Sequence, residues 1–202
     1  MTLKTGFSLL VVVAHPDPAS LNVAIAAAVV NTAKSTGAGV VVHDLYADGF
    51  DPLLGVAEMR GPVFADELCA RYAADLLAAD ALVIVHPLWF FQAPAVLKGW
   101  VDRVVREDVA FELAADGAVT GLLTVETALI ITTGNTSRAT EREALGDPVT
   151  RFWRDVVLGP AGVGVVERLA YTPVRASTSE TREGWLAEIS ASVRDLLTMK
   201  SA

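Results

Sequence analysis

The fold is decided by residues 83–104, which read VIVHPLWFFQAPAVLKGWVDRV. The run from Ala81 to Val85 is short, apolar and rich in β-branched residues, which is typical of a strand covered on both faces. Pro94 suits the first turn of a helix, and the apolar residues after it are spaced by three and four, as on one helix face. The segment therefore predicts a buried strand, an aromatic loop and an amphipathic helix in succession.

Apolar runs and helical patterns alternate along the rest of the chain. Runs of apolar, mostly β-branched residues predict five strands, at Ser8 to Ala14, Val40 to Val42, Ala81 to Val85, Ala128 to Thr132 and Val163 to Tyr171. Amphipathic spacing predicts helices at Ser20 to Gly37, Glu67 to Ala78, Pro94 to Val104, Pro148 to Val157 and Ser177 to Leu197. Because crossover connections place helices on both faces of a parallel sheet, the alternation predicts one α/β domain over residues 1–202.

Three segments lack clear periodicity and are predicted to be irregular. Ala47 to Asp66 contains several Gly and Pro residues and reads as a surface excursion, to which we assign no chemistry. Arg106 to Val125 contains Asp116-Gly117 and is predicted to be a lid or a partner-contacting excursion. Thr136 to Asp147 is polar and is predicted to be a long loop.

Composition bounds the class of protein. The chain has 202 residues, 52% of them hydrophobic, which is enough for one α/β domain with a substantial core. The net charge of −8 argues against a nucleic-acid surface, so a phosphate ligand would depend on local backbone donors. A lone cysteine, Cys69, rules out an internal disulfide and fits a reducing compartment. Since no segment approaches the roughly 20 apolar residues of a membrane span, the protein is expected to be cytoplasmic.

Three loops with unusual residues follow predicted strands. They span His15 to Asn22, Pro87 to Gln92 and Thr132 to Asn135. In open parallel sheets, ligands bind outside the carboxyl ends of the strands, near the point where the strand order reverses. We therefore expect these three loops to meet in space and to form one site.

The first loop offers donors for an anion. It lacks the G-x-G-x-x-G pattern, and no P-loop pattern occurs in the chain, so neither dinucleotide-binding motif is supported. The Ser20 hydroxyl, the N–H groups of Leu21 and Asn22 at a helix N-terminus, and the His15 imidazole could still bind a phosphate. The alternative is that Ser20 only caps the helix and that His15 only ends a strand.

The other two loops suit a flat ring with a polar rim. Trp89 and Phe90 could contact the plane or edge of an isoalloxazine, and the N–H groups of Thr133 and Gly134 could bond its pyrimidine side. The alternative is that the aromatic residues pack in the core or across a subunit interface, which is the interpretation favoured for Phe91.

Other catalytic classes are not supported. No His, Cys or carboxylate residues have convincing metal-ligand spacing, so no metal site is predicted. No G-x-S-x-G elbow occurs, which argues against a Ser-His-Asp hydrolase. His43 and His86 lie next to apolar runs, and structural roles are favoured for both.

Several blocks together resemble the flavodoxin-like NAD(P)H:quinone oxidoreductases, which include the ancillary oxidoreductases of potassium-efflux systems. The blocks are His15-Pro16, Ser20-Leu21-Asn22, Asp44-Leu45-Tyr46, Pro87-Leu88-Trp89-Phe90, the PAVLKGWVDRV run at 94–104, and Thr132-Thr133-Gly134. The resemblance covers roughly residues 7 to 135, and its most specific part extends from Pro87 to Val104.

The resemblance implies a flavodoxin-like three-layer sandwich with a five-stranded parallel sheet of order 2-1-3-4-5. It further implies a homodimer with non-covalent FMN or FAD, reduced by NADH or NADPH, that reduces quinones or similar electrophiles by hydride transfer in a ping-pong mechanism. The matching residues would hold the flavin phosphate (His15, Ser20, Leu21, Asn22), one side of the ring (Pro87, Leu88, Trp89, Phe90) and its other side (Thr132, Thr133, Gly134).

The chain departs from that family after Gly134. The further glycines, and the Tyr and His that assist hydride transfer, have no clear counterpart there, so no catalytic side chain is identified. Arg138 or Arg142 could meet the 2′-phosphate of NADPH. Two alternatives stay open: a flavin-binding regulatory or ancillary subunit of a transporter, and a one-electron carrier of flavodoxin type. Azo and nitro compounds are alternative acceptors.

Overall fold

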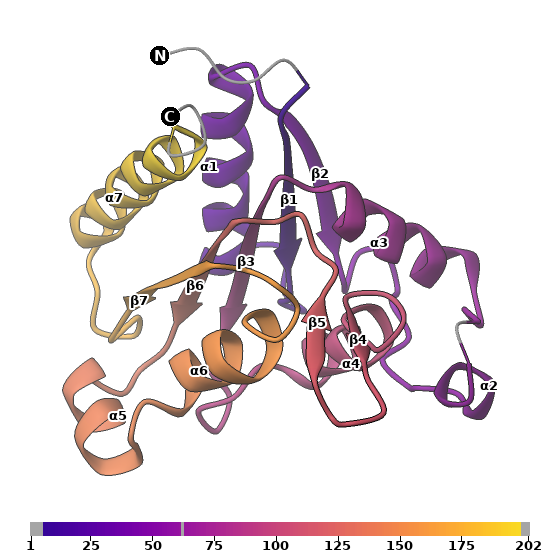
Figure 1. The fold of residues 1–202 in the computed structure, drawn as a ribbon. Helices are drawn as coiled ribbons and strands as arrows, with labels where there is room; N and C mark the ends of the chain where they lie inside the picture. Colours follow the sequence, from indigo (N-terminus) through magenta and orange to yellow (C-terminus); the bar gives the residue numbers. More distant parts are fainter. Residues whose placement is uncertain (1–5, 62, 199–202) are drawn as a thin grey trace.

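The chain is built on a five-stranded parallel sheet, seen in a computed structural model that describes residues 6–61 and 63–198 (Figure 1). The strands of this sheet are β1 (Ser8–Val13), β2 (Gly39–Asp44), β3 (Ala81–Pro87), β6 (Thr127–Thr133) and β7 (Val165–Tyr171). Their order is β2-β1-β3-β6-β7, with every neighbouring pair parallel. Apart from the short hairpin strands β4 (Phe111–Leu113) and β5 (Val119–Gly121), this is the predicted order 2-1-3-4-5.

Helices cover both faces of the sheet, as Figure 1 shows. They are α1 (Leu21–Ser35), α2 (Val56–Met59), α3 (Glu67–Ala78), α4 (Ala95–Val104), α5 (Arg138–Leu145), α6 (Pro148–Arg151) and α7 (Ser179–Thr198). A π-helical stretch, η1 (Phe152–Leu158), continues α6, so the helix predicted at 148–157 has two parts. None of the helices in the described ranges combines the length and the apolar character that crossing a bilayer requires.

The alternation of side chains along β1 explains why both faces need cover. Leu10 and Val12 point to the face that is packed by α3, α4 and η1. Leu9, Val11 and Val13 point to the face that is packed by α1 and α7. All five side chains are buried, because successive residues of a strand face opposite sides and this strand has helices on each side.

The polar segment predicted to be a loop between Thr136 and Asp147 is a helix, α5, and that prediction was wrong. The Ser137 hydroxyl accepts a hydrogen bond from the N–H of Thr140 at 3.0 Å, and Gly146 ends the helix with φ 69°. The segment has no apolar stripe by which periodicity could find it. Ion pairs stabilise it instead, including one between Glu141 and Arg168 with a 2.6 Å N–O distance.

A buried ion cluster anchors the segment between β2 and α3, which contains the short helix α2. The Arg103 guanidinium on α4 donates to both carboxylate oxygens of Glu58, at 3.0 and 2.8 Å, and to the Asp51 carbonyl oxygen at 2.6 Å. Asp66 accepts a further bond from Arg103. The segment lies so close to α4 that a Cβ on Gly99 would come within 2.3 Å of Pro52. The apparently irregular segment is therefore fixed to the core by charge.

Removing the cation from this cluster should destabilise the fold strongly. Burial raises the pKa of Glu58, but the hydrogen bonds from Arg103 and from backbone N–H groups outweigh burial and lower it to about 2. Arg103→Met would leave this carboxylate buried without its cation, and we expect a loss of roughly 3–5 kcal/mol in the free energy of unfolding. Lys98→Met is the matched control on the same helix, because its pair with Asp102 is exposed and should contribute less than about 1 kcal/mol. Urea denaturation of both variants tests this, and equal losses would contradict it.

Candidate functional site

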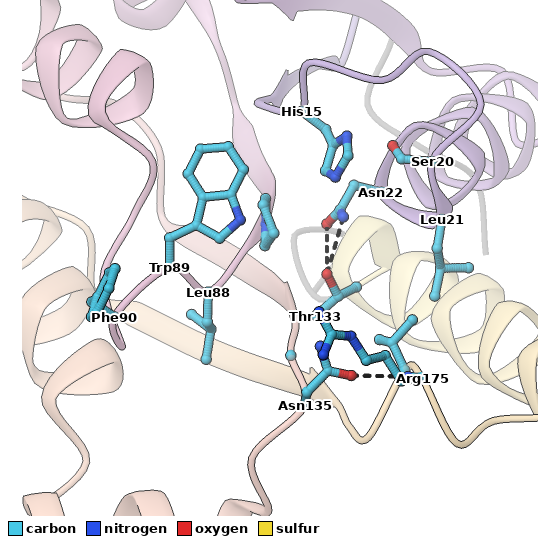
Figure 2. A pocket seen from close by; sticks show the side chains of 13 residues that line it. His15, Ser20, Leu21, Asn22, Leu88, Trp89, Phe90, Thr133, Asn135 and Arg175 are labelled. Atoms are coloured by element: carbon cyan, nitrogen blue, oxygen red, sulfur yellow. Dashed lines mark hydrogen bonds between the residues drawn. The ribbon is translucent and has the colours of Figure 1, made fainter.

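The loops that follow β1, β3 and β6 meet around one cavity of about 470 Å³ (Figure 2). Thirteen residues line it: His15, Ser20, Leu21, Asn22, Pro87, Leu88, Trp89, Phe90, Thr133, Gly134, Asn135, Val174 and Arg175. The structure thus brings together every predicted site residue except Thr132. The volume lies within the range of small-molecule sites, which is roughly 300–1,000 Å³.

One corner of the cavity is the N-terminus of α1. Ser20 caps the helix, since its hydroxyl oxygen accepts a hydrogen bond from the N–H of Val23 at 3.3 Å. The backbone N–H groups of Leu21 and Asn22 have no acceptor among the described residues. The N–H groups of a first helical turn carry partial positive charge, so this corner can hold an anion.

The His15 side chain also faces the cavity, opposite Trp89, in Figure 2. The two ring centroids are 6.5 Å apart. Nδ1 of His15 lies 3.1 Å from the backbone nitrogen of Asp17 and 3.3 Å from its carbonyl oxygen, so Asp17 engages Nδ1 in either tautomer. Nε2 has no hydrogen-bond partner among the described residues and is available to a ligand beside the N-terminus of α1.

The Asn22 side chain has a role that the sequence did not reveal. Its Nδ2 donates to the Thr133 hydroxyl at 3.0 Å, and that hydroxyl donates to Asn22 Oδ1 at 3.1 Å. Both side chains are buried. The pair joins the start of α1 to the end of β6, and the backbone N–H of Asn22 stays available to a ligand.

The aromatic loop is a tight hairpin turn. Trp89 and Gln92 exchange backbone hydrogen bonds at 3.2 and 3.0 Å, and the two residues between them, Phe90 and Phe91, have φ 51° and 57°. Positive φ at both central positions is the pattern of a turn that normally favours Asn and Gly, and bulky residues adopt it at a cost in free energy. The turn leaves the Phe90 side chain 100% exposed and Trp89 44% exposed at the cavity.

His86 fixes the start of this loop through hydrogen bonds in the core. It is fully buried; its Nδ1–H donates to the Pro87 carbonyl oxygen at 2.9 Å, and its Nε2 accepts from the Trp153 indole N–H at 3.0 Å. Burial lowers the pKa of His86 to about 4, so the ring is neutral at pH 7. The structural role favoured for His86 agrees with these contacts.

Thr132 lies behind the cavity wall and does not line the cavity. Its hydroxyl donates to the Leu169 carbonyl oxygen at 3.3 Å and accepts from Arg168 Nε at 3.0 Å. Strand alternation explains the difference, because Thr132 and Thr133 point to opposite faces. Thr133 reaches the cavity, and Thr132 contacts the neighbouring strand β7.

Three lining residues, Asn135, Val174 and Arg175, were missing from the predicted set. Hydrogen bonds join the loop after β6 to the loop after β7: Gly134 N–H to the Tyr171 carbonyl oxygen (3.1 Å), Val174 N–H to the Gly134 carbonyl oxygen (2.9 Å) and Arg175 N–H to Asn135 Oδ1 (2.9 Å). The loop after β7 thus completes one wall. The carboxyl-end rule, applied to the fifth predicted strand as well, could have found Val174 and Arg175.

Comparison with known proteins agrees with this architecture. A family model described as "Flavodoxin-like fold" matches residues 8–192. The NAD(P)H dehydrogenase (quinone) 1 of Rattus norvegicus is 30% identical over 203 residues, 87% of this chain and 74% of the relative. The ribosyldihydronicotinamide dehydrogenase (quinone) of Homo sapiens is 29% identical over 208 residues, 90% and 88% respectively. A structure of an FMN-dependent NADH-azoreductase from Bacillus anthracis in complex with FMN shares the fold, with TM-score 0.73 at 16% identity over 95% of this chain and 99% of that one.

These matches define the class: the chain has the flavodoxin-like fold over most of its length. Within that class, the chain belongs to the NAD(P)H:quinone oxidoreductases, which are oxidoreductase enzymes. The family expected from residues 7 to 135 is confirmed. The match also extends through the final third, where the sequence blocks gave only a general alternation.

The buried histidines should make stability depend on pH in a defined window. Burial lowers the pKa of His86 and of His43 to about 4, from 6.5 in an unfolded chain. Well above pH 6.5 both rings are neutral in the folded and the unfolded chain. As the pH falls through 6.5 the unfolded chain binds protons first, so stability falls as the pH falls toward 4. Between pH 6.5 and 5 each ring should account for about 1.5 kcal/mol.

His86→Gln removes one of the two titrating rings. Urea denaturation at pH 6.5 and pH 5 should therefore show a loss of stability about 1.5 kcal/mol smaller than in the wild type, whatever the variant's absolute stability. Ending the window at pH 5 keeps Glu58, whose pKa lies lower, nearly ionised in both states. An unchanged loss would show that His86 is not kept neutral by burial.

Proposed function

We propose that the protein is a flavin-dependent NAD(P)H oxidoreductase that reduces quinones or similar electrophilic acceptors by two electrons. One observation carries the proposal: a single cavity joins the open N-terminus of a helix to an aromatic loop. The first feature suits a phosphate and the second a flat ring, and a phosphorylated flavin has both groups in one molecule. Membership of the quinone oxidoreductase family supports the same reading.

The residues present fit a flavin phosphate. The N–H groups of Leu21 and Asn22 are directed outward from the first turn of α1 and have no acceptor among the described residues. The His15 imidazole and the Ser20 hydroxyl lie at the same corner. These donors are fixed by the helix and its cap, so binding an anion requires little reorganisation.

The opposite part of the cavity fits the ring. Leu88 and Trp89 offer apolar surface to a ring. The two N–H groups expected from the sequence at this rim are engaged in the protein: that of Gly134 donates to the Tyr171 carbonyl oxygen, and the pairing of Thr133 with Pro87 directs that of Thr133 toward β3. Leu88 side-chain atoms lie 3.7–3.9 Å from the place where a Cβ on Gly134 would be, which is ordinary van der Waals contact, so Leu88 packs against the backbone of Gly134 at this wall.

When bound, the flavin would accept a hydride from NAD(P)H and pass two electrons to the acceptor. The protein's residues bind the flavin, orient it and shield part of its ring. The α1 N-terminus fixes the phosphate end, the aromatic loop covers part of the ring, and the joined loops after β6 and β7 close one wall. One open cavity serves both substrates, so we propose that they occupy it in turn, as in a ping-pong mechanism.

The proposal includes finer points. FMN is the flavin of the compared azoreductase, and FAD has the same phosphate and ring. The human relative is named for ribosyldihydronicotinamide and the rat relative for NAD(P)H, so we propose both classes of molecule as candidate electron donors. We further propose one domain over residues 1–202, a cytoplasmic location and a homodimer, in which a second chain covers the exposed Phe90.

A spectroscopic experiment tests the function. Protein mixed with excess FMN or FAD and then desalted should stay yellow, and anaerobic NADH, NADPH or ribosyldihydronicotinamide should bleach it. Adding a quinone should restore the colour without further donor. Colourless protein after desalting, or a bound flavin that none of the three donors bleaches, would contradict the proposal.

Trp89 should contribute to ring binding. Trp89→Ala removes the aromatic face at the cavity, and we expect the dissociation constant for FMN to rise about tenfold. Quenching of flavin fluorescence measures it. Phe152→Ala is a control of similar chemistry, because Phe152 packs against Trp153 on η1 and does not line the cavity. Equal effects of the two substitutions would assign Trp89 a merely structural role.

A further inference from the structure

The cavity differs in charge from the protein as a whole. The chain carries a net charge of −8, yet none of the thirteen lining residues is an aspartate or a glutamate. Arg175 is the one permanent cation among them. A neutral, partly apolar cavity with a single guanidinium favours an anionic ligand group by local charge, against the overall field of the protein.

The position of Arg175 is fixed by its backbone. Its N–H donates to Asn135 Oδ1 at 2.9 Å, and the preceding residue, Val174, donates to the Gly134 carbonyl oxygen at 2.9 Å. Figure 2 shows Arg175 beside Asn135, below Thr133 and Leu21, on the side of the cavity away from Trp89. The stem of the side chain is therefore held at the rim near the start of α1.

The guanidinium of Arg175 is available to a ligand. It forms no ion pair or hydrogen bond with any residue of the described ranges. The arginines nearby are engaged: Arg138 forms two 2.7 Å bonds with Asp147, and Arg182 donates to Ser177 and Val174. Arg138, which the sequence offered as a partner for a 2′-phosphate, is thus held by a carboxylate.

We propose that Arg175 recognises a phosphate group of the nucleotide in the cavity and so makes the site select phosphorylated ligands. The inference rests on the proposed function and names a specificity residue for it. A guanidinium offers several donors in a planar fork that matches phosphate oxygens, whereas the α1 N-terminus supplies only partial charge. The phosphate can belong to the flavin or to the nicotinamide donor, and the two sources are separated by experiment.

The first experiment tests the flavin phosphate. Dissociation constants for FMN and for riboflavin, which lacks the phosphate, are measured by fluorescence quenching with wild type and Arg175→Gln. FMN should bind about tenfold more weakly to the variant, since a charge-assisted hydrogen bond is lost, and riboflavin should be unaffected. The substitution keeps the backbone N–H that bonds Asn135. Arg175→Lys, which keeps the charge, should recover part of the difference.

The second experiment tests the donor phosphates. With flavin at saturating concentration, the KM for NADH and for NADPH is compared with the KM for ribosyldihydronicotinamide, which has no phosphate. In Arg175→Gln the KM of the two phosphorylated donors should rise about tenfold relative to that of the third. A larger effect with NADPH than with NADH would assign Arg175 to the 2′-phosphate.

Arg194→Gln is the matched control, because it removes the same charge from an exposed position on α7 that does not line the cavity. A phosphate-dependent effect of Arg175→Gln in either experiment, absent from this control, supports the inference. Effects equal to those of Arg194→Gln in both experiments overturn it. Wild-type protein that binds none of FMN, FAD and riboflavin would refute the proposed function together with the inference, whereas wild-type binding that Arg175→Gln leaves unchanged refutes the inference alone.

Discussion

The hydrogen-bonded pair of Asn22 and Thr133 is the junction on which the site depends. These residues are 111 positions apart in the chain, and their buried side chains join the first turn of α1 to the end of β6. A buried amide and hydroxyl that satisfy each other leave little freedom at either element. The anion corner and the rim of the ring site are therefore held at a fixed separation by the protein, before any ligand enters.

Much of the fold and part of the site could be predicted from the sequence. The apolar, β-branched runs of β1, β3 and β6 favour strands covered on both faces, and parallel strands place the loops that follow them at one edge of the sheet. The strand order, by contrast, was expected only from the family resemblance. Because the loops share one edge, ten of the predicted residues line one cavity. Thr132 does not, because a motif read as consecutive residues ignores that neighbours on a strand face opposite ways.

What could not be predicted depends on contacts between distant polar residues. Helix α5 has no apolar stripe, and its stability comes from Arg168 and Asp147, neither of which lies within it. The fixed conformation of the segment around α2 depends in the same way on Arg103, which looked like one more charge on an amphipathic helix. Val174 and Arg175 escaped notice because their loop joins the site through backbone hydrogen bonds, which leave no pattern in side-chain types.

The wall formed with the loop after β7 has a consequence for the dynamics of the protein. β7 is one of the two outer strands of the sheet, and among residues 6–61 and 63–198 no strand pairs with it on the side away from β6. An outer strand is the natural place for local opening and for amide hydrogen exchange. The loop that follows β7 also builds the cavity, through Val174 and Arg175. A ligand bound in the cavity would stabilise β7 against local opening, so ligand binding and the opening of this outer strand are linked equilibria.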